Sequence, residues 1–332
     1  MKKIILVSFI CGLFLLTGCG KYGEKDIVKD LSKNIENTKG YHLEAEMEIN
    51  NNEDKYSYNV AVSYQNEDYF RVSLKNKANN HEQILLRNKD GVYVLTPSLN
   101  KSFKFQSDWP YNNSQSYILQ TIIKDIKDDK DRTFEETDNY YVFTTKVNYP
   151  NNRNLEKQVV YFDKSLNLKE IQVLNAENDP EIKVKFTKLD MKATYNDKYF
   201  SINENMQTAA VDDLIEPVSK IEDVVYPMYI PTNTTLGSQD KVSKTDGERI
   251  ILTFNGEKPF ILVEETAVKE AELTTIPTFG EPYLLNDTIG SISTNSVSWI
   301  SNGIEYYIAS DVIKTEELTE IAKSINVIAV GK

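Results

Sequence analysis

Cysteine and histidine are almost absent from this chain of 332 residues, which contains two of each. Both cysteines, Cys11 and Cys19, lie near the amino terminus, so the remainder has no thiol for a disulfide or a nucleophile. The histidines, His42 and His81, lie 39 residues apart and cannot form the His-Glu-x-x-His helix of a metalloprotease. A glycine-rich phosphate loop is also missing from the sequence. We therefore expect no metal, no cofactor and no enzymatic activity.

Basic residues are fewer than acidic residues in this chain. Lysine and arginine number 38 against 50 aspartates and glutamates, which gives a formal net charge of −12. Such a chain is repelled by nucleic acid and by anionic lipid headgroups, so we expect neither as an electrostatic partner. The acidic run 125–131 could suggest calcium, but Lys130 stands where the sharp turn of a calcium loop requires glycine. A solvated helix end is the favoured interpretation of this run.

The amino terminus carries the most specific pattern in the chain. Two lysines precede an apolar run from Ile4 to Leu16, whose 13 residues are too few to span about 30 Å of hydrocarbon. The run ends in Leu16-Thr17-Gly18-Cys19, which resembles a bacterial lipobox. The resemblance implies a signal peptide over 1–18 and a diacylglycerol-modified Cys19 as the first mature residue. Two acyl chains form a stable anchor.

We therefore expect an extracytoplasmic protein held on the cell membrane through Cys19. The alternative is an ordinary cleaved signal with an incidental cysteine. Abundant Asn, Lys, Ile and Tyr are typical of an AT-rich genome, which suggests a Gram-positive bacterium.

Hydrophobic periodicity predicts one helix and then a long series of strands. Residues 25–38 have apolar residues at helical spacing, and from Tyr41 the period changes to two, which is typical of half-buried strands. The connections are too short for crossover helices, so the sheet is predicted to be antiparallel. Strands are predicted at 41–49, 56–64, 69–75, 83–88, 92–96, 102–106, 140–146, 158–163, 168–174 and 182–189, with a helix at 117–126 and an extended piece at 199–202.

A second, smaller domain is predicted after a polar stretch that contains Pro217. Its strands are expected at 249–254, 260–265, 289–293, 297–300 and 305–309, followed by a helix at 316–325. Thr315 is the expected N-cap of this helix. The chain is thus divided into a signal peptide (1–18), a tether (19–24), a large sheet domain (25–203), a linker (204–223) and a small α+β domain (224–332).

Several segments resemble a known superfamily. Asn88-Lys89-Asp90-Gly91-Val92-Tyr93-Val94-Leu95-Thr96-Pro97 is similar to a strand in the middle of the sheet of the lipoprotein carriers LolA, LolB and RseB. The segment 184–202 resembles the closing strands of that fold, and residues 224–330 resemble a small domain of unknown function appended to it. The whole arrangement is similar to sporulation and germination lipoproteins of the YdcC and GerS types.

The resemblance implies a mainly β fold, in which a curved antiparallel half-barrel with capping helices precedes the small α+β domain. In carriers the concave face of the half-barrel holds acyl chains. In GerS-like relatives the implied role is to bind and support a cell-wall amidase. A protein that is itself acylated cannot shuttle through an aqueous space, so the resemblance favours a tethered adaptor.

Aromatic residues are the remaining candidate for a site. The candidate ligand-binding or lid aromatics are Tyr58, Tyr93, Phe103, Trp109 and Tyr111, the last two in a candidate lid loop at 108–111. The favoured interpretation is ordinary core. The alternatives are the lining of a cavity for an acyl chain or apolar peptide, and a platform for stacking sugars.

Three functions compete at this point. The leading hypothesis is a membrane-anchored, non-enzymatic binding or adaptor protein of the cell envelope, sporulation or germination, with a cell-wall amidase or another envelope protein as partner. The second is a carrier that holds acyl chains of lipid or lipoprotein in the concave face. An envelope hydrolase ranks third.

Overall fold

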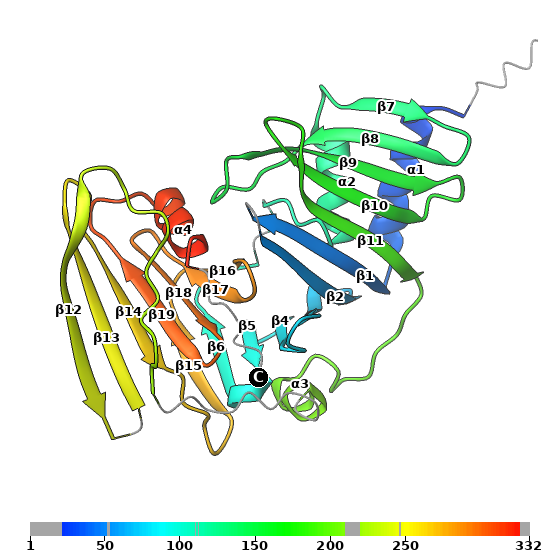
Figure 1. The fold of residues 1–332 in the computed structure, drawn as a ribbon. Coiled ribbons are helices and arrows are strands. Elements are labelled where there is room, and N and C mark those ends of the chain that lie inside the picture. Colours follow the sequence, from blue (N-terminus) through cyan, green and yellow to red (C-terminus); the bar gives the residue numbers. More distant parts are fainter. Residues whose placement is uncertain are drawn as a thin grey trace, which may run out of the picture.

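The computed structural model describes residues 22–51, 54–109, 111, 113–209, 220–245 and 247–325. It consists of two curved, largely antiparallel sheets that lie next to each other, with helices against them (Figure 1). The predicted signal peptide and Cys19 lie outside the described residues, as do Pro110 of the candidate lid loop and most of the predicted linker. The mainly β class predicted from the sequence is confirmed.

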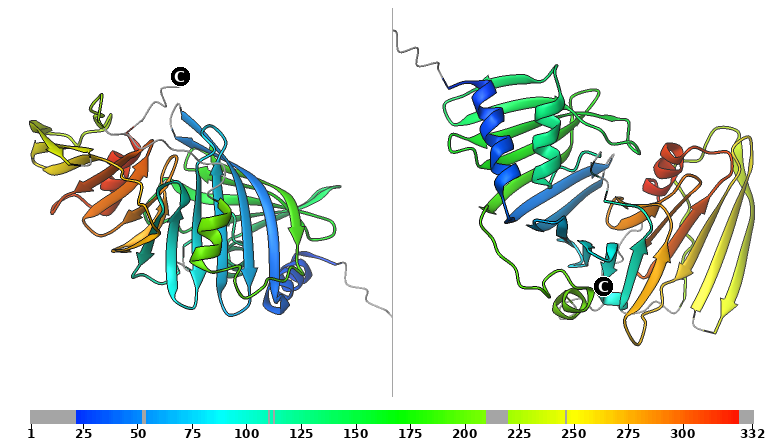
Figure 2. Two further views of the ribbon diagram at one scale, coloured as in Figure 1. Left: turned by 90° about the horizontal axis from the view of Figure 1, so that it is seen from below. Right: turned by 180° about the vertical axis from the view of Figure 1, so that it is seen from behind.

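The larger sheet has twelve strands and bends into an open half-barrel (Figure 2). Its strands are β1 (Gly40–Asn51), β2 (Asp54–Gln65), β3 (Tyr69–Asn76), β4 (Glu82–Asn88), β5 (Gly91–Thr96), β6 (Lys101–Phe105), β7 (Thr133–Glu136), β8 (Tyr140–Lys146), β9 (Leu155–Asp163), β10 (Leu168–Asn175), β11 (Pro180–Asp190) and β15 (Thr274–Thr278). Their order is β15-β6-β5-β4-β3-β2-β1-β11-β10-β9-β8-β7. Strands β1 to β6 form one meander and β7 to β11 form another. Because β1 pairs with both β2 and β11, the two meanders join in one continuous sheet.

Two helices cover the concave face of this half-barrel, α1 (Glu24–Asn37) and α2 (Leu119–Asp128) (Figure 2). Ile27 and Leu31 of α1 and Ile122 and Ile126 of α2 are buried against the sheet at the four-residue spacing of one helix face. Burial of such a side chain contributes about 1.5–3 kcal/mol. Both predicted helices are therefore present, with ends shifted by one or two residues.

The outer face of the half-barrel is covered by a third helix. This helix, α3 (Ile202–Ala209), and the turn before it place Phe200 and Met206 in a small core with Ile84 and Tyr93 of the sheet. The extended piece predicted at 199–202 is wrong, because this segment turns into the helix. The predicted linker at 204–223 likewise begins inside α3 rather than after it.

The smaller sheet has seven strands in the order β12-β13-β14-β19-β18-β17-β16. The strands are β12 (Thr234–Lys244), β13 (Gly247–Gly256), β14 (Phe260–Thr266), β16 (Glu281–Leu284), β17 (Ile289–Ile292), β18 (Ser296–Ser301) and β19 (Ile304–Ala309), and α4 (Thr315–Lys323) packs on β18 and β19. The N-cap of α4 is Lys314, not Thr315 as predicted. The Thr315 hydroxyl instead donates to the carbonyl of Thr294, which fastens the helix to the β17–β18 turn.

The C-terminal region also contributes to the larger sheet. Strand β15 pairs in parallel with β6, from Thr274 beside Lys101 to Thr278 beside Phe105. The Asn100 side chain donates to the Glu270 carbonyl at 2.7 Å and holds the segment that leads into β15. The described residues beyond 220 therefore do not form a unit separate from the half-barrel.

Candidate binding site at the concave face and the domain junction

The aromatic residues of the candidate lid loop form part of the core. The ring of Trp109 stacks on Phe70 with centroids 4.7 Å apart, and its side chain is 2% exposed. Tyr111 is half-buried, with its ring 6.3 Å from Phe70 and the Arg87 guanidinium 5.2 Å above it. Stacked pairs of this kind add about 0.5–1.5 kcal/mol to the area that they bury. The loop segment thus covers the concave face with its own side chains.

The other three candidate aromatics do not gather at one place. Tyr58 and Phe103 lie on the concave side, where Tyr58 is 2% exposed. Tyr93 lies on the outer face, next to Phe200 and under α3. The structure therefore brings Tyr58, Phe103, Trp109 and Tyr111 to the concave side and separates Tyr93 from them.

A loop of the smaller sheet closes the concave face. This closing loop, residues 285–288 between β16 and β17 together with Ile289 at the start of β17, meets the buried amide of Gln83 on β4. The Thr288 hydroxyl and the Ile289 N–H donate to Gln83 Oε1, and Gln83 Nε2 donates to the Ile289 carbonyl at 3.3 Å. The Tyr58 hydroxyl donates to the Asn286 carbonyl beside them. Since a buried amide without partners costs about 1–3 kcal/mol, these bonds fix the loop in place.

A pocket lies beside the closing loop. This junction pocket has a volume of about 140 Å³ and lies between the half-barrel and the smaller sheet. Met47 and Ile49 of β1 and Ile182 of β11 supply apolar wall on one side, and Tyr283 and Leu284 of β16 supply it on the other. None of the five candidate aromatics lines it.

Two asparagines hold the walls of the junction pocket together. Asn51 Nδ2 donates to Asn286 Oδ1 at 3.0 Å and to the Lys323 carbonyl at 3.2 Å, and Asn286 Nδ2 donates to the same carbonyl at 2.7 Å. The end of β1, the closing loop and the end of α4 are therefore joined by side-chain amides. The pocket is built into the fold rather than left between two loosely packed parts.

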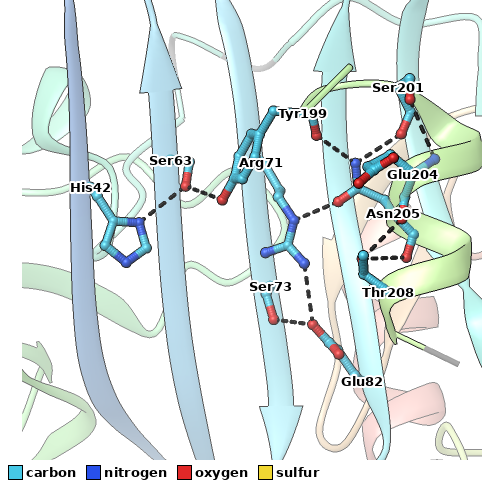
Figure 3. Close-up of polar contacts among 10 residues, drawn as sticks. All are labelled: His42, Ser63, Arg71, Ser73, Glu82, Tyr199, Ser201, Glu204, Asn205 and Thr208. Atoms are coloured by element: carbon cyan, nitrogen blue, oxygen red, sulfur yellow. Dashed lines mark hydrogen bonds and ion pairs between the residues drawn. The ribbon is translucent and has the colours of Figure 1, made fainter. Parts of the chain in front are cut away.

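A polar row crosses the outer face of the half-barrel (Figure 3). His42 Nδ1 lies 3.1 Å from Ser63 Oγ, and His42 Nε2 lies 3.1 Å from Glu44 Oε1. Hydrogen bonds to Lys188 and His42 lower the pKa of Glu44. The arrangement contains the residue types of a hydrolase triad, but Ser63 is 1% exposed and its oxygen lies 2.9 Å from the Tyr199 hydroxyl that covers it. Because a nucleophile must reach the substrate carbonyl, the row is placed to hold Tyr199 rather than to attack a substrate.

The acidic run 125–131, at the end of α2 and just after it, makes contacts with other parts of the half-barrel. Asp125 accepts hydrogen bonds from the Ser114 hydroxyl at 2.7 Å and from Gln158 Nε2 at 3.0 Å, and burial raises its pKa to about 6. Asp131 pairs with Lys146 at the surface. Within the part of the chain that the structure describes, no group of three or more His, Cys, Asp or Glu side chains is placed to hold a metal ion.

Comparison with known proteins identifies the family. Residues 1–200 match the family of YdcC-like sporulation proteins. The sporulation protein YdcC of Bacillus subtilis (strain 168) is 34% identical over 334 residues, which cover 98% of this chain and 98% of that protein. This chain belongs to the YdcC-like sporulation protein family. The resemblance to the YdcC type predicted from the sequence is confirmed.

Solved structures similar to this YdcC-like chain come from other bacteria. A chain of the Pseudomonas aeruginosa MucA/MucB complex is 12% identical, with a TM-score of 0.35 and coverage of 88% of this chain and 96% of that chain. A chain of the complex between the CwlD amidase of Clostridioides difficile and the GerS lipoprotein is 19% identical, with a TM-score of 0.30 and coverage of 52% and 96%. At these TM-scores the likenesses carry no conclusion about function.

The residues that close the concave face were not predicted from the sequence. The sequence contains one signal. Gln83 occupies an inward position of β4, on the same side of the strand as Leu85 and Arg87. A polar residue at such a position requires a buried partner. The sequence did not show that this partner is the backbone of Thr288 and Ile289, about 200 residues further along the chain.

Proposed function

We propose that this YdcC-like protein is a non-enzymatic binding protein that acts in sporulation on the outer side of the cell membrane, with a protein as its ligand. Family membership supports the link to sporulation. The lipobox-like sequence that ends in Cys19 supports the anchor. In the described residues no helix is long and apolar enough to cross a membrane.

The observation that carries the proposal is the closure of the concave face. A carrier needs an empty apolar groove there, whereas here Trp109, Phe70 and Tyr58 fill the face and Gln83 fastens the closing loop over it. The junction pocket of about 140 Å³ is smaller than the roughly 300 Å³ at which ligand pockets begin. The closed face therefore favours a role in binding proteins over carriage of acyl chains.

The proposal is tested with the full chain and its Cys19→Ala variant, expressed in sporulating cells. We expect the unsubstituted chain in the membrane fraction, with a mass increased by the diacylglyceryl group, and the variant without that mass. A protein partner should be cross-linked to the unsubstituted chain. By resemblance to GerS-like proteins, a cell-wall amidase is one partner to look for.

Two outcomes would contradict the proposal. Stoichiometric lipid extracted from the purified Cys19→Ala variant, which has no acyl chains of its own, would favour the carrier alternative. Hydrolysis of peptidoglycan or ester substrates, abolished by one substitution such as Ser63→Ala, would favour an enzyme.

A further inference from the structure

The size of the junction pocket limits what it can hold. A cavity of about 150 Å³ accommodates a molecule of the size of benzene. The junction pocket, at about 140 Å³, has room for one ring or one branched aliphatic side chain. It reaches the surface beside Asn50 and Pro150, which are both exposed. A bulky side chain could enter it from solvent, while most of a lipid chain would remain outside.

The pocket lies beside an edge strand of the smaller sheet. Strand β16 (Glu281–Leu284) is the last strand of the seven-stranded sheet, and in the described residues no strand pairs with its outer edge. Three consecutive residues, Pro282, Tyr283 and Leu284, line the pocket. An unpaired edge accepts an extended segment through main-chain hydrogen bonds, and a neighbouring pocket then selects one of its side chains.

The lining of the pocket also includes polar side chains and charges of both signs. The Lys323 side chain is 14% exposed, and its ammonium lies 5.9 Å from the Tyr283 ring centre and 3.9 Å from a Glu320 oxygen. Glu181 is half-buried on the opposite wall, where burial raises its pKa. Asn113 and Asn152 add amide groups. Amides and paired charges suit the polar backbone of a peptide, whereas an acyl chain offers them no hydrogen bond.

We propose that the junction pocket holds one bulky apolar side chain, aromatic or aliphatic, of an extended segment of the partner protein, and that this segment adds to the outer edge of β16. The inference rests on the proposed function and locates the contact at which it takes place. A buried anchor of this kind dominates binding, because a few residues in fully desolvated pockets carry most of the affinity of an interface.

The test uses the full chain in detergent and capped peptides of the sequence Thr-Thr-X-Thr-Thr. With X as Phe, we expect methyl NMR shifts confined to the methyl-bearing side chains that line the pocket, which are Met47, Ile49, Leu85, Leu155, Ile182, Leu284 and Leu285. With X as Ala, affinity should fall about tenfold or more. Shifts elsewhere, equal affinity of the two peptides, or displacement of the Phe peptide by decanoate from the same methyl groups would overturn the inference.

A pocket-filling variant extends the test to the natural partner. Ile49→Trp places a large ring in the pocket and should reduce capture of the cross-linked partner about tenfold or more. Ile261→Trp, on the exposed side of β14, is the matched control and should leave capture unchanged. Capture that survives Ile49→Trp would overturn the inference and leave the proposed function intact, whereas failure to capture any protein with the unsubstituted chain would count against the proposed function. The peptide shifts on the unsubstituted chain do not depend on how well the variant folds.

Discussion

Glu264 is a buried acid with one hydrogen-bond donor. Its side chain is 0% exposed on β14, and both carboxylate oxygens accept the Val225 N–H, at 3.0 and 3.3 Å. Burial raises its pKa from 4.5 to about 7, while the bond from Val225 lowers it. Tyr306, which pairs with Glu264 across the sheet, supplies a neutral neighbour whose own pKa is raised by burial. The core of the smaller sheet thus favours the protonated acid.

This shift predicts that Glu264 makes folding less favourable as the pH rises. Below pH 4.5 the acid is protonated in both states, and between about 4.5 and 7 the native state binds more protons than the unfolded state, so stability falls. The accumulated loss is about 3 kcal/mol at pH 8. Glu264→Gln can still accept the Val225 N–H but does not titrate. Urea unfolding at pH 5 and pH 8 should therefore show a smaller loss of stability for the variant, and equal losses in the two proteins would contradict the assignment.

At the scale of elements, α3 is held on the half-barrel by one buried amide. Asn205 Oδ1 accepts a hydrogen bond from Arg71 Nε, and its Nδ2 donates to the carbonyls of Tyr199 and Ser201 at 2.8 Å each (Figure 3). Arg71 in turn lies 3.5 Å from Glu82. The helix is short, so these contacts and the burial of Phe200 and Met206 keep it in place rather than its own propensity.

Asn205→Ala should therefore release this segment while the rest of the fold stays intact. Loss of three hydrogen bonds, one of them to a charged group, predicts a local destabilisation of about 2–3 kcal/mol. Hydrogen exchange should accelerate by one to two orders of magnitude over residues 199–209 and stay unchanged in α1. Thr208→Ala is the control, because that hydroxyl donates only to carbonyls of its own helix. Faster exchange throughout the half-barrel would show that α3 supports the whole sheet.

The elements that the sequence predicted are those with a one-sided apolar pattern. Strands β1 and β2 alternate over most of their length, so their existence and the face that each residue occupies follow from the apolar period. Strand β12 was missed because it is exposed on both faces beyond Thr234 and shows no apolar period. Both faces of β5 are buried, so this strand has no alternation of apolar and polar residues. The sequence pattern therefore does not show that Tyr93 faces α3 while Val92 and Val94 face the concave core.

The candidate site was less predictable than the fold. It forms where Asn51 and Gln83 of the half-barrel bond to the closing loop, Asn51 to Asn286 and Gln83 to Thr288 and Ile289, and the loop lies about 200 residues further along the chain. Each is a common polar residue in an ordinary strand or loop, and only the docking of the smaller sheet on the half-barrel brings them together. The aromatic residues were predicted as candidates because of their large apolar area. Most of them instead fill the core of the half-barrel.

At the scale of the whole molecule, these junction contacts couple the two sheets. Strand β15 completes the edge of the half-barrel, and the closing loop fills its concave face. Neither sheet can unfold without exposing the core of the other. We therefore expect one cooperative transition for the described fold rather than two.

The two tryptophans allow this coupling to be measured. Trp109 stacks on Phe70 in the half-barrel, and Trp299 stacks on Tyr306 in the smaller sheet with centroids 5.0 Å apart. In Trp299→Phe the fluorescence reports the half-barrel alone, and in Trp109→Phe it reports the smaller sheet alone. In each variant the urea midpoint from fluorescence should coincide with that from far-UV circular dichroism, because both sheets lose structure together. A fluorescence midpoint displaced from the dichroism curve, in opposite directions in the two variants, would show that the sheets unfold separately and that the junction contributes little to stability.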